Sequence, residues 1–147
     1  MKHLPEHGSC FVCGKENDQS IGIRWFLRED RAIWGAITLT EKQQGPPNLA
    51  HGGATAALLD EAMGAAVWNE GFVAAAVNIN IDYLKPVRLG VKIEITGRFV
   101  ERKGKSIHAY GEIVLPDGGI AVVSKGIYVE APQLFEEQLN QYKKFKS

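Results

Sequence analysis

Residues 51–62 read HGGATAALLDEA, and this stretch decides the fold because it opens the one long helix expected before the C-terminal tail. After His51, two glycines lead into a run of Ala, Leu, Met and Val that extends from Gly53 to about Trp68. The Asn-Glu-Gly sequence of residues 69–71 then supplies a stop signal. The apolar residues surround the helix axis instead of forming a stripe, so we expect a helix buried on most sides.

Segments with strand patterns flank this helix on both sides. Residues 21–30 and 31–40 predict a hairpin and residues 41–50 a loop, and Val77–Tyr83 alternates apolar with polar side chains. Further strands are predicted at 91–102, 106–115 and 120–130, separated by short glycine turns, and a terminal helix at 131–147. The order of two strands, helix, four strands and C-terminal helix predicts an α+β fold, with an antiparallel sheet packed against one central helix.

Length and charge limit the possible functions. The 147 residues, 45% of them hydrophobic, suit a single domain over 1–147 with an N-terminal leader (1–20) and a C-terminal tail (131–147). Seventeen basic residues balance seventeen acidic ones, which argues against binding nucleic acid or an anionic membrane through bulk charge. With no signal-like or membrane-length apolar segment, we expect a cytoplasmic protein whose two cysteines are reduced.

The glycines ahead of the helix suggest a binding site. The first N–H groups of a helix have no partner within the helix and lie at the positive end of its dipole. Gly52 and Gly53 would let a ligand approach these donors closely, and an alkoxide developing on a carbonyl carbon would suit the position. The alternative interpretation is that both glycines only permit tight packing at the helix entrance.

Two adjacent acids, Asp60 and Glu61, lie inside the apolar run. A carboxylate in apolar surroundings is costly to desolvate, which raises its pKa and makes it a candidate base or nucleophile. Helical spacing does not choose between the two acids, and one of them could instead reach solvent through a gap. Gly52 and Asp60 are eight residues apart, or about 12 Å along a helix axis. If they act on one carbonyl, one subunit must supply the donor and another the carboxylate.

Together these residues resemble a known family. The His51-Gly52-Gly53 motif, followed after six residues by Asp60 and then by NINIDYLKPVRLG (78–90), is similar to the hotdog-fold acyl-CoA thioesterases of the phenylacetate-pathway type. The resemblance covers about residues 20 to 130, and the leader sequence CFVCGKEN (10–17) also resembles a segment of some members. It implies a sheet wrapped around the helix, homodimers or homotetramers, and hydrolysis of an acyl-CoA to a carboxylic acid and coenzyme A without a cofactor.

The resemblance also implies roles for single residues. The Gly52 N–H would polarise the thioester carbonyl, and Asp60 of the other subunit would act as general base or nucleophile. His51 would orient the loop, Gly53 would border the substrate, and Glu61 ranks second to Asp60. Separately, four basic residues could contact the phosphates of coenzyme A, or could be ordinary solvated turn residues: Lys85, Arg88, Lys103 and Lys105.

The chain departs from the family pattern at two positions. Many members carry an asparagine where this chain has Gly45, and Asn48, Gln43 or Gln44 could substitute for it. Some members carry a serine or threonine near the reacting water where this chain has Ala76. These departures keep open a non-hydrolytic acyl-CoA binding or sensing module as the alternative function. A hotdog hydratase fits the motif poorly.

The N-terminus contains four residues of zinc-ligand type, namely His3, His7, Cys10 and Cys13, in an H-x3-H-x2-C-x2-C pattern. Loops this tight rarely close a tetrahedron without a helix or a knuckle. We therefore expect incidental histidines, a small apolar cysteine pair and no bound metal.

Overall fold

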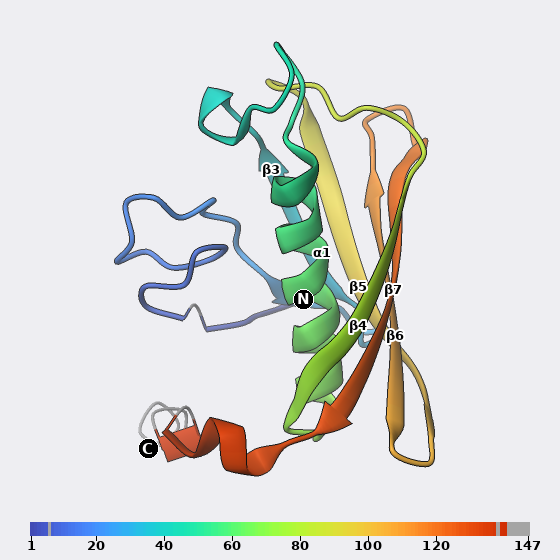
Figure 1. The fold of residues 1–147 in the computed structure, drawn as a ribbon. Helices are drawn as coiled ribbons and strands as arrows, with labels where there is room; N and C mark the ends of the chain where they lie inside the picture. Colours follow the sequence, from blue (N-terminus) through green and yellow to red (C-terminus); the bar gives the residue numbers. More distant parts are fainter. Residues whose placement is uncertain (6, 138, 141–147) are drawn as a thin grey trace.

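The structure is a computed structural model and describes residues 1–5, 7–137 and 139–140 (Figure 1). In this part of the chain one long helix, α1 (Gly52–Asn69), lies against a seven-stranded sheet, which confirms the predicted α+β class. The helix is one residue longer at each end than expected. The strands are β1 (Lys2–His3), β2 (Phe26–Leu27), β3 (Ile33–Thr38), β4 (Ala74–Tyr83), β5 (Lys92–Lys103), β6 (Ser106–Val114) and β7 (Ile120–Glu130).

The strand order across the sheet is β1-β2-β3-β5-β6-β7-β4, and every neighbouring pair is antiparallel. The glycine turns predicted from the sequence join β5 to β6 and β6 to β7. β4 follows the helix along the chain but pairs with β7, from Ala74 opposite Glu130 to Tyr83 opposite Val122. β4 is therefore an edge strand, and its outer side has no partner strand among the described residues.

One stripe of α1 packs on the concave side of the curved sheet (Figure 1). The buried helix residues recur once per turn, mostly as adjacent pairs, and are Thr55, Leu58, Leu59, Ala62, Met63, Ala66 and Val67. Each fully buried leucine contributes about 2 kcal/mol of hydrophobic stabilisation. The closest approach is at Gly97 in β5, where an added Cβ would lie 2.3 Å from the Ala62 carbonyl oxygen. Only glycine allows the helix backbone to come so near the sheet at this point.

The helix is less enclosed than its sequence suggests. The N-terminal leader lies on a second side of α1, away from the sheet (Figure 1). A third side carries Ala56, Asp60 and Gly64; the two small residues are half-buried and Asp60 is exposed. Burial on most sides is therefore incomplete in a single chain, which leaves a face of small residues open around Asp60.

The first hairpin is shorter than predicted. β2 has only two residues, because residues 21–23 donate backbone hydrogen bonds to Phe11 and Val12 of the leader instead of extending the sheet. The sequence also gave no sign of β1, which pairs Lys2 with Leu27. Both differences arise because the leader, which lies outside the predicted hairpin, binds backbone groups of this segment.

The predicted terminal helix is only partly covered by the structure. Residues Pro132–Phe135 form a 3-10 turn, and the Phe135 ring packs edge-on against Trp68 with 5.0 Å between ring centroids. Residues 138 and 141–147 of that prediction lie outside the described residues. Among the residues that are described, no helix is long and apolar enough to cross a membrane.

Candidate active site

The first turn of α1 has one backbone donor available to a ligand. His51 is the N-cap, and its Nδ1 accepts a hydrogen bond from the Gly53 N–H at 2.8 Å, so the neutral ring carries its proton on Nε2. The N–H groups of Ala54 and Thr55 donate to the His51 carbonyl oxygen. Within the described chain, the Gly52 N–H donates to no acceptor. Gly52, and not Gly53, therefore offers its N–H at the positive end of the helix.

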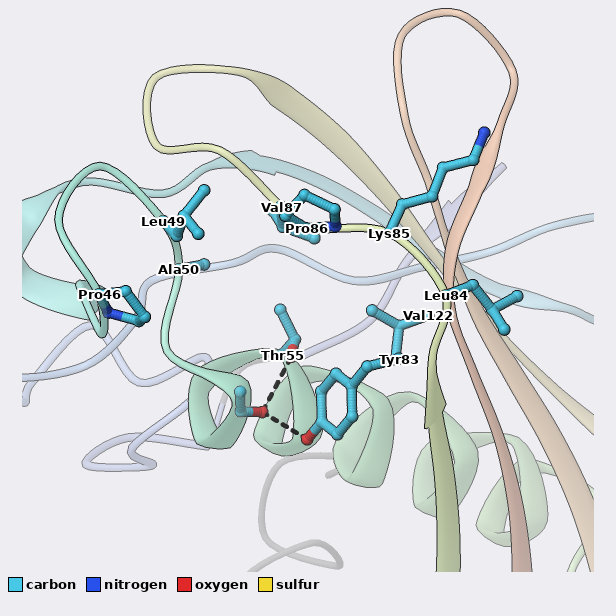
Figure 2. A pocket seen from close by; sticks show the side chains of 11 residues that line it. Pro46, Leu49, Ala50, Thr55, Tyr83, Leu84, Lys85, Pro86, Val87 and Val122 are labelled. Atoms are coloured by element: carbon cyan, nitrogen blue, oxygen red, sulfur yellow. Dashed lines mark hydrogen bonds between the residues drawn. The ribbon is translucent and has the colours of Figure 1, made fainter.

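Gly52 also forms part of the wall of a pocket of about 330 Å³, the size of a small-ligand site. Most of the lining is apolar and includes Pro46, Leu49, Leu84, Pro86, Val87 and Val122. Figure 2 shows the hydroxyls of Thr55 and Tyr83 converging on one oxygen, the Gly52 carbonyl, to which each donates at 2.9 Å. These bonds fix the first helical turn at the edge of an apolar cavity.

The loop before the helix, residues 41–50, packs closely against His51. The His51 N–H donates to the Gln43 carbonyl oxygen at 2.7 Å, and an added Cβ at Gly45 would lie 2.9 Å from His51 Cα. An asparagine at position 45 would therefore displace the loop. The side-chain oxygens of Gln43 and Gln44 accept backbone hydrogen bonds within the loop, the second from Asn48. Two of the three possible substitutes for the family asparagine thus stabilise the loop itself.

The two adjacent acids of α1 lie in different surroundings. Glu61 is turned toward the leader, where it accepts hydrogen bonds from Trp25 Nε1 at 2.6 Å and Cys10 Sγ at 2.9 Å. Burial by itself would raise the pKa of Glu61, but the nearby His7 and the hydrogen bonds from Cys10 and Trp25 outweigh burial and lower the pKa. Glu61 is thus a fully engaged carboxylate.

Asp60, unlike Glu61, has a carboxylate without a hydrogen-bond donor among the described residues. It lies on the open side of the helix. Partial desolvation beside the helix, with a smaller contribution from the charge of Glu61, raises the pKa of Asp60. A carboxylate with a raised pKa is a stronger base, so these surroundings distinguish Asp60 from Glu61 where helical spacing could not.

The edge strand β4 exposes apolar surface at the same side of the molecule. Its register with β7 shifts between Ala76 and Asn78, and Val77 within the shift is 59% exposed. Tyr83 at the end of the strand and Leu84 just beyond it are also more than half exposed. Ala76, where relatives can carry a hydroxyl, provides only a methyl group. An unpaired strand edge with apolar side chains is a surface that another chain can cover.

One chain does not bring the four predicted phosphate-binding residues together. Lys85 lines the pocket, and the Arg88 backbone pairs with Leu49 in the pocket wall. Lys103 and Lys105 lie at the opposite end of β5, a strand of 12 residues or about 40 Å. There the Lys103 ammonium pairs with Glu101 at 3.2 Å.

A second group of polar residues lies close together in the structure, and the sequence pattern named only three of its four members. His7, Cys10, Cys13 and Glu61, here called the leader cluster, place one potential metal-ligand atom each within 4.8 Å of all the others. His3 is not part of it and instead packs against Phe26 in β2. Burial, with the negative charge of Glu61 nearby, raises the pKa of both thiols. Glu61 was missed as a member because 48 residues separate it from Cys13.

The sequence model described as Thioesterase superfamily matches residues 48–122, about half of the chain, including the Gly52 turn and Asp60. The chain belongs to the thioesterase superfamily. Within this superfamily, rat acyl-coenzyme A thioesterase THEM4 is 32% identical over 92 residues, which cover 63% of this chain and 37% of that protein. The mouse protein of the same name is 33% identical over the same shares. The chain thus spans little more than a third of the length of these curated relatives.

Solved structures of the superfamily share the fold. One thioesterase superfamily protein superposes with a TM-score of 0.81 at 30% identity, over 84% of this chain and 61% of that one. The Escherichia coli PaaI protein from the phenylacetic acid degradation operon superposes with a TM-score of 0.70 at 23% identity, over 79% of this chain and 86% of its own. These superpositions confirm the predicted hotdog fold.

The capping bond of His51 gives a stability prediction for this superfamily member. Replacing His51 by alanine removes the acceptor for the Gly53 N–H, so we expect the free energy of unfolding to fall by about 1 kcal/mol. His51→Asn is the matched control, because asparagine is among the best N-cap residues and restores an acceptor. Chemical denaturation measures both variants, and equal losses in the two would show that the cap is not what His51 contributes.

Proposed function

We propose that this chain hydrolyses acyl-CoA thioesters to a carboxylic acid and free coenzyme A, at a site shared between two copies of the chain. The observation that carries the proposal is the unpaired Gly52 N–H at the wall of an apolar pocket. Such a donor, aimed at a carbonyl oxygen, stabilises the negative charge that develops when a nucleophile adds to the thioester carbon.

Asp60 supplies the second half of the chemistry. As general base it takes a proton from a water molecule, and the resulting hydroxide adds to the carbonyl carbon. The tetrahedral intermediate then collapses, the carbon–sulfur bond breaks, and the coenzyme A thiolate recovers the proton from Asp60. The alternative is direct attack by the Asp60 carboxylate, which forms an anhydride that water then hydrolyses. Both routes give the same products and need the same acid.

Geometry favours two copies. Gly52 and Asp60 of one chain are separated by about 12 Å along α1, too far to act on one carbonyl. The open face around Asp60 has small residues that let a second helix approach, and the neighbouring β4 edge has free backbone groups and exposed Val77. A two-fold contact through this side would place two helices antiparallel and bring Gly52 of each copy toward Asp60 of the other. We propose a homodimer as the minimal active form, with a tetramer as the alternative assembly.

The substrate class follows from the pocket and from the relatives. The curated mammalian relatives are named acyl-coenzyme A thioesterases, and the related fold of smu.793 from Streptococcus mutans was solved bound to acetyl CoA. The apolar pocket beside Gly52 suits an acyl or pantetheine chain, and Lys85 in its lining and Arg88 in a neighbouring pocket suit the phosphates. Lys103 and Lys105 could contribute only from the second copy.

An acyl-CoA panel tests the proposal. The full chain is incubated with short, medium, long and aromatic acyl-CoA substrates, and the released thiol is measured with a chromogenic disulfide. We expect release that saturates with at least one acyl class. The Ala76 departure favours a second candidate, a non-hydrolytic acyl-CoA binding module, which would give tight binding by calorimetry and no thiol release. Absence of both binding and release across the panel would exclude both functions.

A further inference from the structure

The leader cluster has the composition and position of a metal site outside the proposed active site. It combines an imidazole, two thiols and a carboxylate, the ligand types that Zn²⁺ accepts. Three of the residues come from a seven-residue loop, and the fourth, Glu61, projects from the outer side of α1. Contacts across such a distance in sequence arise only when the leader folds back onto the helix.

The spacing of the ligand atoms is close to that of a tetrahedral zinc site. Zinc–sulfur bonds of about 2.3 Å and zinc–nitrogen or zinc–oxygen bonds of about 2.0–2.1 Å place neighbouring ligand atoms about 3.3–3.8 Å apart. Cys13 Sγ lies 3.5 Å from His7 Nδ1 and 3.7 Å from Glu61 Oε1. His7 Nδ1 also lies 3.7 Å from Glu61 Oε1. Three separations therefore already match a bound ion.

The separation between Cys10 and Glu61 is that of a protonated thiol and a carboxylate. Cys10 Sγ lies 2.9 Å from Glu61 Oε1, close enough for an S–H group to donate to the carboxylate. Zinc binding would replace this proton and widen the contact by about half an ångström. The two thiol protons would leave to solvent, so that two thiolates, one carboxylate and a neutral imidazole surround the dication.

The loop is built as a knuckle around the two cysteines. Cys10 N–H donates to the His7 carbonyl oxygen, Gly14 N–H donates to the Cys10 carbonyl oxygen, and Val12 N–H points at Cys10 Sγ at 3.4 Å. A Cβ at Gly14 would lie 2.3 Å from the Cys10 nitrogen, so this tight turn requires glycine. The knuckle that the sequence alone did not reveal is therefore present.

Trp25 orients the Glu61 carboxylate by a hydrogen bond to the oxygen that faces away from the cysteines. Its indole N–H donates to Glu61 Oε2 at 2.6 Å, while Glu61 Oε1 faces the cysteines and His7. Metal-ligating groups are commonly oriented in this way by a second hydrogen bond on their other atom. Trp25 itself is buried in the core, which makes the orientation of Glu61 rigid.

We propose that the leader cluster binds one Zn²⁺ ion in a closed, four-ligand structural site that fastens the N-terminal leader to α1. Four protein ligands leave no open position for substrate, so the ion has a structural and not a catalytic role. Bound zinc would fix Glu61 and the helical turn that also carries Asp60.

Metal content tests the proposal without any assay of activity. The full chain, without a histidine tag, is produced in zinc-supplemented medium, and zinc is measured by mass spectrometry against protein concentration. We expect about one zinc per chain. Removal with a chelator should lower the melting temperature, and added zinc should restore it. Cobalt in place of zinc should give the absorption bands of tetrahedral thiolate coordination.

Matched histidine variants separate this site from adventitious binding. His7→Gln removes a ligand whose side chain is 64% exposed, so the fold should survive while affinity in a chelator competition falls at least about tenfold. His3→Gln is the same change four residues away, outside the leader cluster, and should keep wild-type zinc. Cys10→Ser should weaken the cobalt thiolate bands, because only the Cys13 thiolate remains.

Three results would overturn the site. The first is wild-type protein that carries no zinc and shows no change in melting temperature when zinc is added. The second is equal loss of zinc in His3→Gln and His7→Gln, which would mean surface binding by histidines. The third is a Cys10–Cys13 disulfide in freshly purified protein, seen as a mass lower by two hydrogens.

Discussion

Replacing Asp60 by asparagine is expected to lower kcat for acyl-CoA hydrolysis by about 10² to 10⁴-fold, the usual contribution of a general base. The change keeps the size of the side chain and removes its negative charge, and with it the ability to take a proton. Because the Asp60 carboxylate accepts no hydrogen bond from the described residues, the fold should not depend on it. Thiol release under saturating substrate gives kcat, and circular dichroism checks the fold.

Asp18→Asn is the matched control for this loss of charge. Asp18 is exposed in the leader, far along the chain from the helix, and its replacement should leave kcat within about twofold of wild type. Wild-type turnover in Asp60→Asn would remove Asp60 from the mechanism.

Replacing Gly52 by proline should lower kcat by about 10² to 10³-fold, the cost of one lost oxyanion donor. Proline removes the backbone N–H and is well accepted at the first position of a helix. His51, with φ −64° and ψ 135°, already has the extended conformation that a residue before proline needs. The substitution therefore deletes the donor with little strain on the backbone.

Gly52→Ala controls for the added side-chain volume. A Cβ at this position lies 3.3 Å from the Tyr83 hydroxyl in either variant, but alanine keeps the N–H. Alanine should therefore retain most of the activity that proline loses. If both variants lose the same activity, the loss comes from the added side-chain volume in the pocket wall and not from the missing Gly52 N–H.

Mixing the two inactive variants tests whether the site is shared. In a hybrid of Gly52→Pro and Asp60→Asn chains, one site contains both changes and the other contains neither. Random pairing of equal amounts should restore about a quarter of wild-type activity, because half of the dimers are hybrids with one intact site each. A site complete within one chain would give no recovery.

The elements predicted best are those with local signals. The limits of α1 followed from the glycines before it and the Asn-Glu-Gly stop after it, and β5, β6 and β7 followed from alternation between glycine turns. The first strand was predicted too long, because the backbone of residues 21–23 is used by the leader. Periodicity within a segment contains no information about a competitor outside that segment.

The candidate site also depends on local and distant signals, and the roles of its residues stay predictions. Gly52 and Asp60 were named from one short motif, since both belong to one helix. Helical spacing alone could not choose between Asp60 and Glu61, because the difference is made by Trp25 and Cys10, which are 36 and 51 residues away from Glu61. The sequence also could not show that the Gly53 N–H donates to His51, because this hydrogen bond depends on the conformation of the N-cap.

The contact between Gly97 and Ala62 has a consequence for which parts of the candidate site can vary. It presses the middle of α1 against the sheet, one turn or less from Asp60, with no room for even a methyl group. Much of the pocket wall, by contrast, comes from connecting segments at residues 46–50 and 84–87, which lie outside the helix and the strands. On the proposed function, substitutions in these segments would change the acyl preference while Asp60 keeps its position.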